Sequence, residues 1–142
     1  MKGTEAMTKQ HLDQLASDYI AAWNTHDTEK AAAFFVEDGV YEDLGPGTIA
    51  RGRAAIRNYF TETFAAFPDV HLALSREPVT KGEQVFAEWV LSGTHRGTFA
   101  GMEATGKRFE VRGATAMELR GDKIVRNTDY LDVLTIVRQL TG

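Results

Sequence analysis

The chain has 142 residues, 43% hydrophobic and 25% charged, a composition typical of one globular domain. The absence of cysteine excludes disulfides, thiolate metal sites and a cysteine nucleophile. A net charge of −4 argues against nucleic-acid binding, which needs basic surface. No apolar run approaches the roughly 20 residues of a membrane span, and the first nine residues lack the apolar core of a signal peptide. We therefore predict a soluble, cytoplasmic, single-domain protein over residues 1–142 that binds neither nucleic acid nor membrane.

The first half of the chain has mainly helical periodicity. Apolar residues recur every three or four positions between residues 8 and 24, which predicts an amphipathic helix. Asp27 has the position of an N-cap for a short second helix that carries Phe34 and Phe35. A short strand is expected over residues 40–43, a turn over 44–47, and a third helix over 52–66.

From residue 70 onward the period changes from 3.6 to 2. Strands are expected over residues 70–75, 85–95, 109–119 and 123–132, with tight turns at 81–83 and 121–122 and a closing helix from Val133. Helices that precede an antiparallel meander indicate an α+β fold. The expected architecture is a cone-shaped α+β barrel, in which a curved antiparallel sheet packs against the N-terminal helices and its concave face holds a pocket.

Asp132 is the first candidate for a catalytic group. A hairpin centred on Gly121 and Asp122 pairs Asp132 with Val111, on the apolar face of the preceding strand. A carboxylate on that face loses solvation, so its pKa should rise and it should become a better general base. In the alternative interpretation, Asp132 caps the helix that begins at Val133. A bulge in the hairpin would also reverse the face on which Asp132 lies.

His95 and Asp43 are the other candidate catalytic residues. His95 continues the inward face of the strand at 85–95, and its alternative is a core histidine bonded to a loop. Asp43 shares a face with Tyr41 just before a Gly-Pro-Gly turn, and its alternative is a turn-forming aspartate. The same pairing rule places Asn127 and Asp129 on the outer face. The expected substrate-binding residues lie on the helix stripes and inward strand faces: Tyr19, Trp23, Tyr41, Trp89, Val111 and Met117.

Motifs for metals and nucleotides are absent from the sequence. There is no glycine-rich phosphate loop, no G-x-S-x-G elbow, and no histidine pair four residues apart with a carboxylate nearby. We therefore expect neither a metal nor an organic cofactor.

Several segments together form a recognisable set: Trp23-Asn24-x-His26-Asp27, the block at 51–56, the segment from His95 to Gly101, and Gly121-Asp122-Lys123-Ile124-Val125 followed by Asp129-Tyr130-Leu131-Asp132. In this order they resemble the SnoaL-like polyketide cyclases of the nuclear-transport-factor-2-like, ketosteroid-isomerase-like superfamily. The resemblance spans nearly the whole chain. It implies ring closure by intramolecular aldol condensation without metal or cofactor, with an aspartate near the C-terminal end as general acid/base.

The resemblance assigns that aspartate to Asp132, which stands seven residues before Gln139, and associates His95 with the pocket. Two positions depart from the family pattern: Thr128 replaces a common tryptophan, and Thr141 replaces a glycine. The substrate implied is a small apolar or polycyclic carbonyl compound.

Three alternatives stay open because this fold hosts many functions. In a ketosteroid-isomerase-like enzyme Asp43 would be the base. An epoxide-hydrolase-like enzyme would use Arg112 and Asp132, although Ala114 stands where a second aspartate is expected. The third alternative is a binding module without catalysis. In each case we expect a homodimer or a larger homo-oligomer, because one face of the sheet is left partly exposed.

Overall fold

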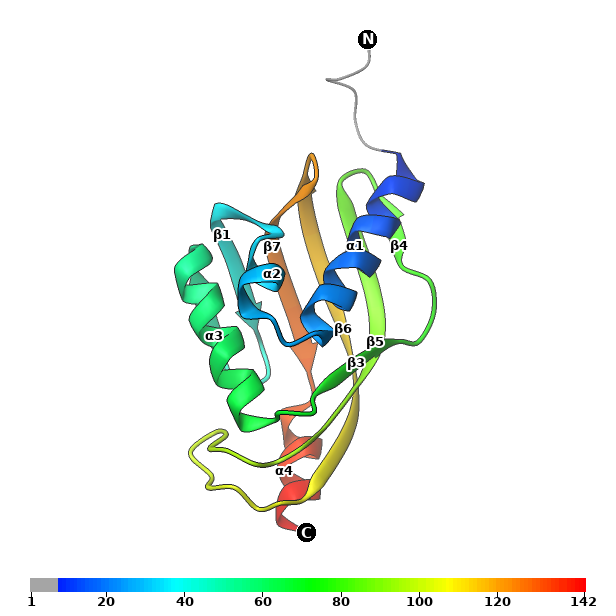
Figure 1. Ribbon diagram of the computed structural model, residues 1–142. Helices are drawn as coiled ribbons and strands as arrows, with labels where there is room; N and C mark the ends of the chain where they lie inside the picture. Colours follow the sequence, from blue (N-terminus) through cyan, green and yellow to red (C-terminus); the bar gives the residue numbers. More distant parts are fainter. Residues whose placement is uncertain (1–7) are drawn as a thin grey trace.

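The computed structural model describes residues 8–142 (Figure 1). Its helices are α1 (Lys9–Asn24), α2 (Thr28–Ala32), α3 (Arg53–Ala66) and α4 (Val133–Thr141). Its strands are β1 (Phe35–Asp43), β2 (Thr48–Arg51), β3 (His71–Leu74), β4 (Val79–Lys81), β5 (Gln84–Thr94), β6 (Arg108–Arg120) and β7 (Lys123–Leu131). Figure 1 shows α1, α2 and α3 against one face of the curved sheet, with α4 at one end. The predicted α+β cone is confirmed.

The sheet is mixed, whereas a wholly antiparallel sheet was expected. In the part of the chain that the structure describes, its order is β2-β1-β7-β6-β5-β3, with β4 also paired to β5. β1 runs parallel to β7, and the other pairs are antiparallel. The meander from β5 to β7 follows the alternating sequence. The pairing of β1 with β7 is long-range, because β2, α3 and the strands β3 to β6 lie between them in the chain.

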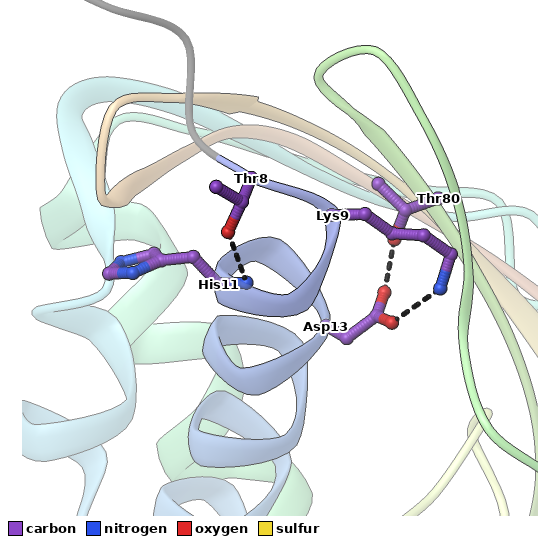
Figure 2. A network of polar contacts seen from close by, with 5 residues as sticks. All are labelled: Thr8, Lys9, His11, Asp13 and Thr80. Atoms are coloured by element: carbon purple, nitrogen blue, oxygen red, sulfur yellow. Dashed lines mark hydrogen bonds and ion pairs between the residues drawn. The ribbon is translucent and has the colours of Figure 1, made fainter.

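The helix termini follow their capping residues. The Thr8 hydroxyl accepts from the His11 backbone N–H at 3.1 Å, and the Lys9 ammonium pairs with Asp13 at 2.8 Å (Figure 2). Asp13 also accepts from the Thr80 hydroxyl, and this hydrogen bond joins the N-terminal part of α1 to β4. Asp27 caps α2 as predicted. However, α2 ends at Ala32, and Phe35 begins β1 instead of continuing the helix.

The core lies between the helices and the inward face of the sheet. The inward residues of β6 are those expected from its period of two, from Phe109 and Val111 to Met117 and Leu119. They meet the apolar stripes of α1 and α3, including Leu12, Ile56 and Phe60. Burial of such side chains contributes about 1.5–3 kcal/mol each relative to exposure.

One register shift in the β6–β7 hairpin changes the face of most of β7. Leu119 pairs with Ile124 as the tight turn predicts, but Glu118 pairs with Arg126, so β7 contains one extra residue. Beyond this bulge Thr115 pairs with Asp129, and Gly113 pairs with Leu131. The expected pairing of Asp132 with Val111 is therefore wrong. Asn127, Asp129 and Leu131 lie on the inward face, because a shift of one residue exchanges the two faces.

Within residues 8–142, no helix has the length and apolar character that crossing a membrane requires.

Candidate active site

A cavity of about 400 Å³ lies between the concave face of the sheet and the helices α1 and α3. Its walls are largely aromatic and apolar. They include Tyr19 and Trp23 from α1, Tyr59 and Phe60 from α3, and Trp89 from β5. The loop at 98–100 and the turn before β2 also border the cavity. A concave apolar space with a few polar groups is the usual form of a small-molecule site.

Asp129 lies in the wall of this cavity and is only 8% exposed. One carboxylate oxygen, Oδ1, accepts from the Thr115 hydroxyl at 2.6 Å and from the Asn127 side-chain amide at 2.9 Å. The other oxygen, Oδ2, accepts from the Tyr41 hydroxyl. Burial raises the pKa of Asp129, and these three hydrogen bonds oppose that rise.

Asp43 lies beside Asp129 on the neighbouring strand, because the parallel pairing of β1 and β7 puts the two residues in register. The Tyr59 hydroxyl donates to Asp43 Oδ2 at 2.7 Å. Asp43 is only 6% exposed, and its Oδ1 has no hydrogen-bond partner among residues 8–142. Burial, followed by the negative charge of Asp129, raises the pKa of Asp43 to about 7. This carboxyl group can therefore accept or release a proton near neutral pH.

Two tyrosines link these carboxyl groups to the aromatic wall. The rings of Tyr41 and Tyr59 are 5.5 Å apart between centroids. Burial raises the pKa of both phenols, and the charge of a neighbouring aspartate acts in the same direction: Asp129 for Tyr41 and Asp43 for Tyr59. Both phenols are therefore protonated hydrogen-bond donors at neutral pH. Together the four residues supply two proton acceptors and two donors at one end of an apolar cavity.

The chain matches the model of the SnoaL-like polyketide cyclases over residues 13–140. The chain belongs to this family. No curated protein matches it. Among solved structures, it is similar to a proposed polyketide cyclase from Xanthomonas campestris pv. campestris, with 27% identity over 93% of this chain and 98% of that one and a TM-score of 0.81.

Two further structures resemble this SnoaL-like chain. IdmH, a proposed polyketide cyclase from Streptomyces antibioticus, is 26% identical over 92% of this chain and 99% of its own, with a TM-score of 0.78. A protein from Catenulispora acidiphila with a ketosteroid-isomerase-like fold, solved in complex with trimethylamine, is 25% identical. That similarity covers 90% of this chain and 92% of the other, with a TM-score of 0.80.

Asp132, the carboxylate that the family pattern and the expected register both selected, lies outside the cavity. It is exposed at the N-cap of α4, where it accepts from the Thr135 backbone N–H at 3.1 Å and from the Thr135 hydroxyl at 2.7 Å. The hydrogen bond from the Thr135 hydroxyl is the main reason why the pKa of Asp132 is lowered. The expectation of a desolvated carboxylate with a raised pKa is corrected, because the bulge moves Asp129 inward and leaves Asp132 at a helix start.

His95 is fully buried but does not border the cavity. Its Nδ1 accepts from the Thr105 backbone N–H at 3.2 Å, and its ring lies 5.6 Å from that of Phe67. Backbone bonds from His95 to Lys107 and Gly106 close the same loop. This geometry matches the alternative of a core histidine bonded to a loop. The loop tip, Thr98 to Ala100, borders the cavity.

Five of the six expected substrate-binding residues border the cavity: Tyr19, Trp23, Tyr41, Trp89 and Met117. Val111 instead lies in the core. Asp43 also borders the cavity, and Arg112, required by the epoxide-hydrolase alternative, lies exposed on the outer face of β6.

Four residues of the site were not predicted from the sequence: Asp129, Thr115, Asn127 and Tyr59. One signal for Asp129 was present, because an unbulged β7 would place the charged Arg126 inward beside Met117. Burying an unpaired arginine is unfavourable, which favours the shifted register. Within residues 8–142, no three His, Cys, Asp or Glu side chains are grouped to hold a metal ion.

Proposed function

We propose that this protein catalyses proton transfer at a carbon acid, leading to intramolecular aldol ring closure of a polyketide-like ketone, with Asp43 as general base. The observation that carries the proposal is the Asp43 carboxyl group in the wall of an aromatic cavity, with a pKa of about 7 and one oxygen that has no hydrogen-bond partner among the described residues. A base with a pKa near the operating pH combines a large ionised fraction with adequate basicity.

In the first step, the Asp43 carboxylate removes a proton from a methylene group beside a substrate carbonyl, and the electron pair moves onto the carbonyl oxygen. The Tyr41 hydroxyl donates to Asp129 Oδ2. When Asp129 is protonated, that bond reverses and the Tyr41 hydrogen is free to stabilise the enolate oxygen by donating a hydrogen bond. The enolate carbon then attacks a second carbonyl of the same molecule and forms the new carbon–carbon bond. The resulting alkoxide takes the proton back from Asp43, so the reaction consumes no cofactor.

The substrate proposed is a flat, largely apolar molecule that carries ketone groups. Trp23, Trp89 and Phe60 offer apolar surfaces to such a ring system. Among the described residues that border the cavity, Asp43, Glu62 and Asp129 are acidic, and none is Lys, Arg or His. A phosphate or free carboxylate in the cavity would therefore be repelled, since it would find no positive charge.

The alternative within the same chemistry is an isomerase, in which Asp43 returns the proton to another carbon of the same substrate. Asp43 is also the base of the ketosteroid-isomerase-like alternative, so its place in the cavity wall supports both reactions. The non-catalytic alternative is a binding module that uses the same aromatic cavity. Both share the prediction that flat ketones bind, and they differ in whether the methylene protons exchange.

The experiment is deuterium exchange. Polycyclic ketones with an activated methylene, such as 2-tetralone and anthrone, are incubated with the protein in D₂O, and α-deuteration is followed by NMR. We expect exchange faster than in buffer, with a rate that rises with pH and levels off above about pH 7 as Asp43 ionises. Asp43→Asn should lower the protein-dependent rate by about 10²- to 10⁴-fold.

Asp132→Asn is the matched control, because it makes the same chemical change at an exposed carboxylate, and it should exchange at the wild-type rate. Loss of exchange in Asp132→Asn with retention in Asp43→Asn would contradict the proposal. Ketones that bind with no protein-dependent exchange would favour the binding module.

We also propose that the protein forms a homodimer through the outer face of the sheet, opposite the helices. Phe86 on β5 and Tyr130 on β7 are 43% and 50% exposed. Their cross-strand partners on β6 are Ala116 and Ala114. Small residues between two aromatic rings make a shallow apolar surface that a second copy could cover. Leu131 does not belong to this face, because it borders the cavity.

A further inference from the structure

Trp89 and Thr115 form a hydrogen-bonded chain behind Asp129. The Trp89 indole N–H donates to the Thr115 hydroxyl oxygen at 2.7 Å, and the Thr115 hydroxyl donates to Asp129 Oδ1 at 2.6 Å. The strand registers set this geometry, because Trp89 pairs with Gly113 and Thr115 pairs with Asp129. Both Trp89 and Thr115 are buried, at 2% and 5% exposure.

Gly113 allows the indole to reach Thr115. A Cβ atom at position 113 would lie 2.4 Å from the Cη2 and Cζ3 atoms of Trp89, well inside contact distance. The indole therefore lies across the space that a side chain at 113 would fill. This arrangement aims its N–H at the next inward residue of β6.

The hydrogen bonds from Trp89 through Thr115 to Asp129 can run in only one direction. An indole N–H donates and cannot accept, so the Thr115 oxygen is the acceptor of that bond. The single hydroxyl hydrogen of Thr115 is then committed to Asp129 Oδ1. Asn127 Nδ2 donates to the same oxygen. Because Oδ1 already accepts two hydrogen bonds, a proton on Asp129 is directed to Oδ2, the oxygen that faces Tyr41.

We propose that Trp89 and Thr115 are positioning residues that keep the proton of Asp129 on the Tyr41 side. When Asp129 is ionised, the Tyr41 hydroxyl donates to Oδ2. When Asp129 is protonated, Oδ2–H donates to the Tyr41 oxygen, and the Tyr41 hydrogen is released to point at a ligand oxygen. This inference rests on the proposed role of Tyr41 as donor to the substrate oxygen, but its test does not require turnover.

The experiment is a ¹³C NMR titration of the side-chain carboxyl of Asp129, assigned by its loss in Asp129→Asn. Thr115→Val keeps the side-chain shape and removes the hydroxyl. The carboxylate then loses a hydrogen bond worth about 1.5–3 kcal/mol, so the pKa of Asp129 should rise by about one pKa unit or more. Thr115→Ser restores the hydroxyl and should return the pKa to within a few tenths of the wild-type value.

Trp89→Phe is the second variant, and it removes the indole N–H while leaving Thr115 in place. The Thr115 hydroxyl is then free to rotate, so the pKa of Asp129 should rise by less than in Thr115→Val. Binding of 2-naphthol, a flat hydroxyl compound that mimics an enol, is measured on the same variants by calorimetry. Affinity should fall about tenfold in Thr115→Val and recover in Thr115→Ser, because the loss of one directed hydrogen bond from Tyr41 to the ligand is worth that much.

The same Asp129 pKa in the wild type and in Thr115→Val would overturn the inference. So would a Thr115→Ser variant in which the Asp129 pKa equals that of Thr115→Val. If Thr115→Val does not fold, an unchanged Asp129 pKa in Trp89→Phe is the overturning result. Failure of the proposed function looks different: no ketone would exchange deuterium, while the Asp129 titration would still respond to the Thr115 hydroxyl.

Discussion

The two inward carboxyl groups, Asp43 and Asp129, are held by different means. Asp129 has three hydrogen-bond donors around it, whereas Asp43 has one, from Tyr59, and a buried oxygen with no hydrogen-bond partner among the described residues. Burial raises the pKa of both groups. Asp43 therefore has the features of a group that exchanges protons, and Asp129 those of a group that orients its neighbours.

Burial of Asp43 should also reduce stability at alkaline pH. The pKa of Asp43 is about 7 in the folded protein, compared with 3.8 for an unperturbed aspartate, so folding favours the protonated form. That contribution to stability is complete below about pH 4 and is lost as the pH rises through about 7. Asp43→Asn removes the buried charge, and at pH 8 it should raise the free energy of unfolding by up to about 4 kcal/mol, measured by urea denaturation.

At pH 4 the same substitution should have a much smaller effect, because the wild-type carboxyl group is then neutral. Asp132→Asn serves again as the control, since an exposed carboxylate has no burial penalty to relieve at pH 8. If Asp43→Asn raised the free energy of unfolding equally at both pH values, the charge of Asp43 would not be the cause of the added stability.

At the level of elements, one extra residue in β7 decides which carboxylate reaches the cavity. The shift between the Leu119–Ile124 pair and the Glu118–Arg126 pair turns Asp129 inward and Arg126 outward. Arg126 then pairs with Glu42 at 2.6 Å on the other face. The strand ends at Leu131, so Asp132 is free to cap α4.

The capping role of Asp132 predicts a structural phenotype. Asp132→Ala removes the acceptor for the Thr135 backbone N–H, so the thermal midpoint should fall by a few degrees in calorimetry. Asp132→Ser, which keeps a capping oxygen, should recover most of the loss. Deuterium exchange at pH 7 should be unchanged in both variants. A large loss of exchange with an unchanged midpoint would instead give Asp132 a functional role.

Across the whole molecule, the helices cover one face of the sheet and leave the other available to a partner (Figure 1). The cavity and the uncovered face therefore lie on opposite sides of the same strands. Side chains alternate between them, with Thr115 inward and its neighbours Ala114 and Ala116 outward. Dimerisation through the outer face would thus leave the cavity open to substrate.

Light scattering should give twice the chain mass of 15.7 kDa at micromolar concentration. Ala116→Glu places a charge between Phe86 and Thr128 on the outer face, and it should weaken the dimer by about tenfold or more. Leu134→Glu is the control, because Leu134 is 58% exposed on α4, away from that face. A monomer in the wild type, or equal weakening by both substitutions, would contradict this interface.

The sequence by itself determined the α+β class, the helix at Lys9–Asn24, the long β5 and β6 strands, the turn at Gly121 and most of the aromatic wall of the cavity. These features depend on local signals: helical and strand periodicity, capping residues and turn chemistry. Asp43 was also a candidate from the sequence, whereas tertiary structure alone placed Asp129 in the site and Asp132 outside it. The bulge in β7 and the parallel pairing of β1 with β7 bring Asp43, Tyr41 and Asp129 together. Long-range pairing and packing set both features, because a single-residue register shift leaves the local pattern almost unchanged while it exchanges the two faces of a strand.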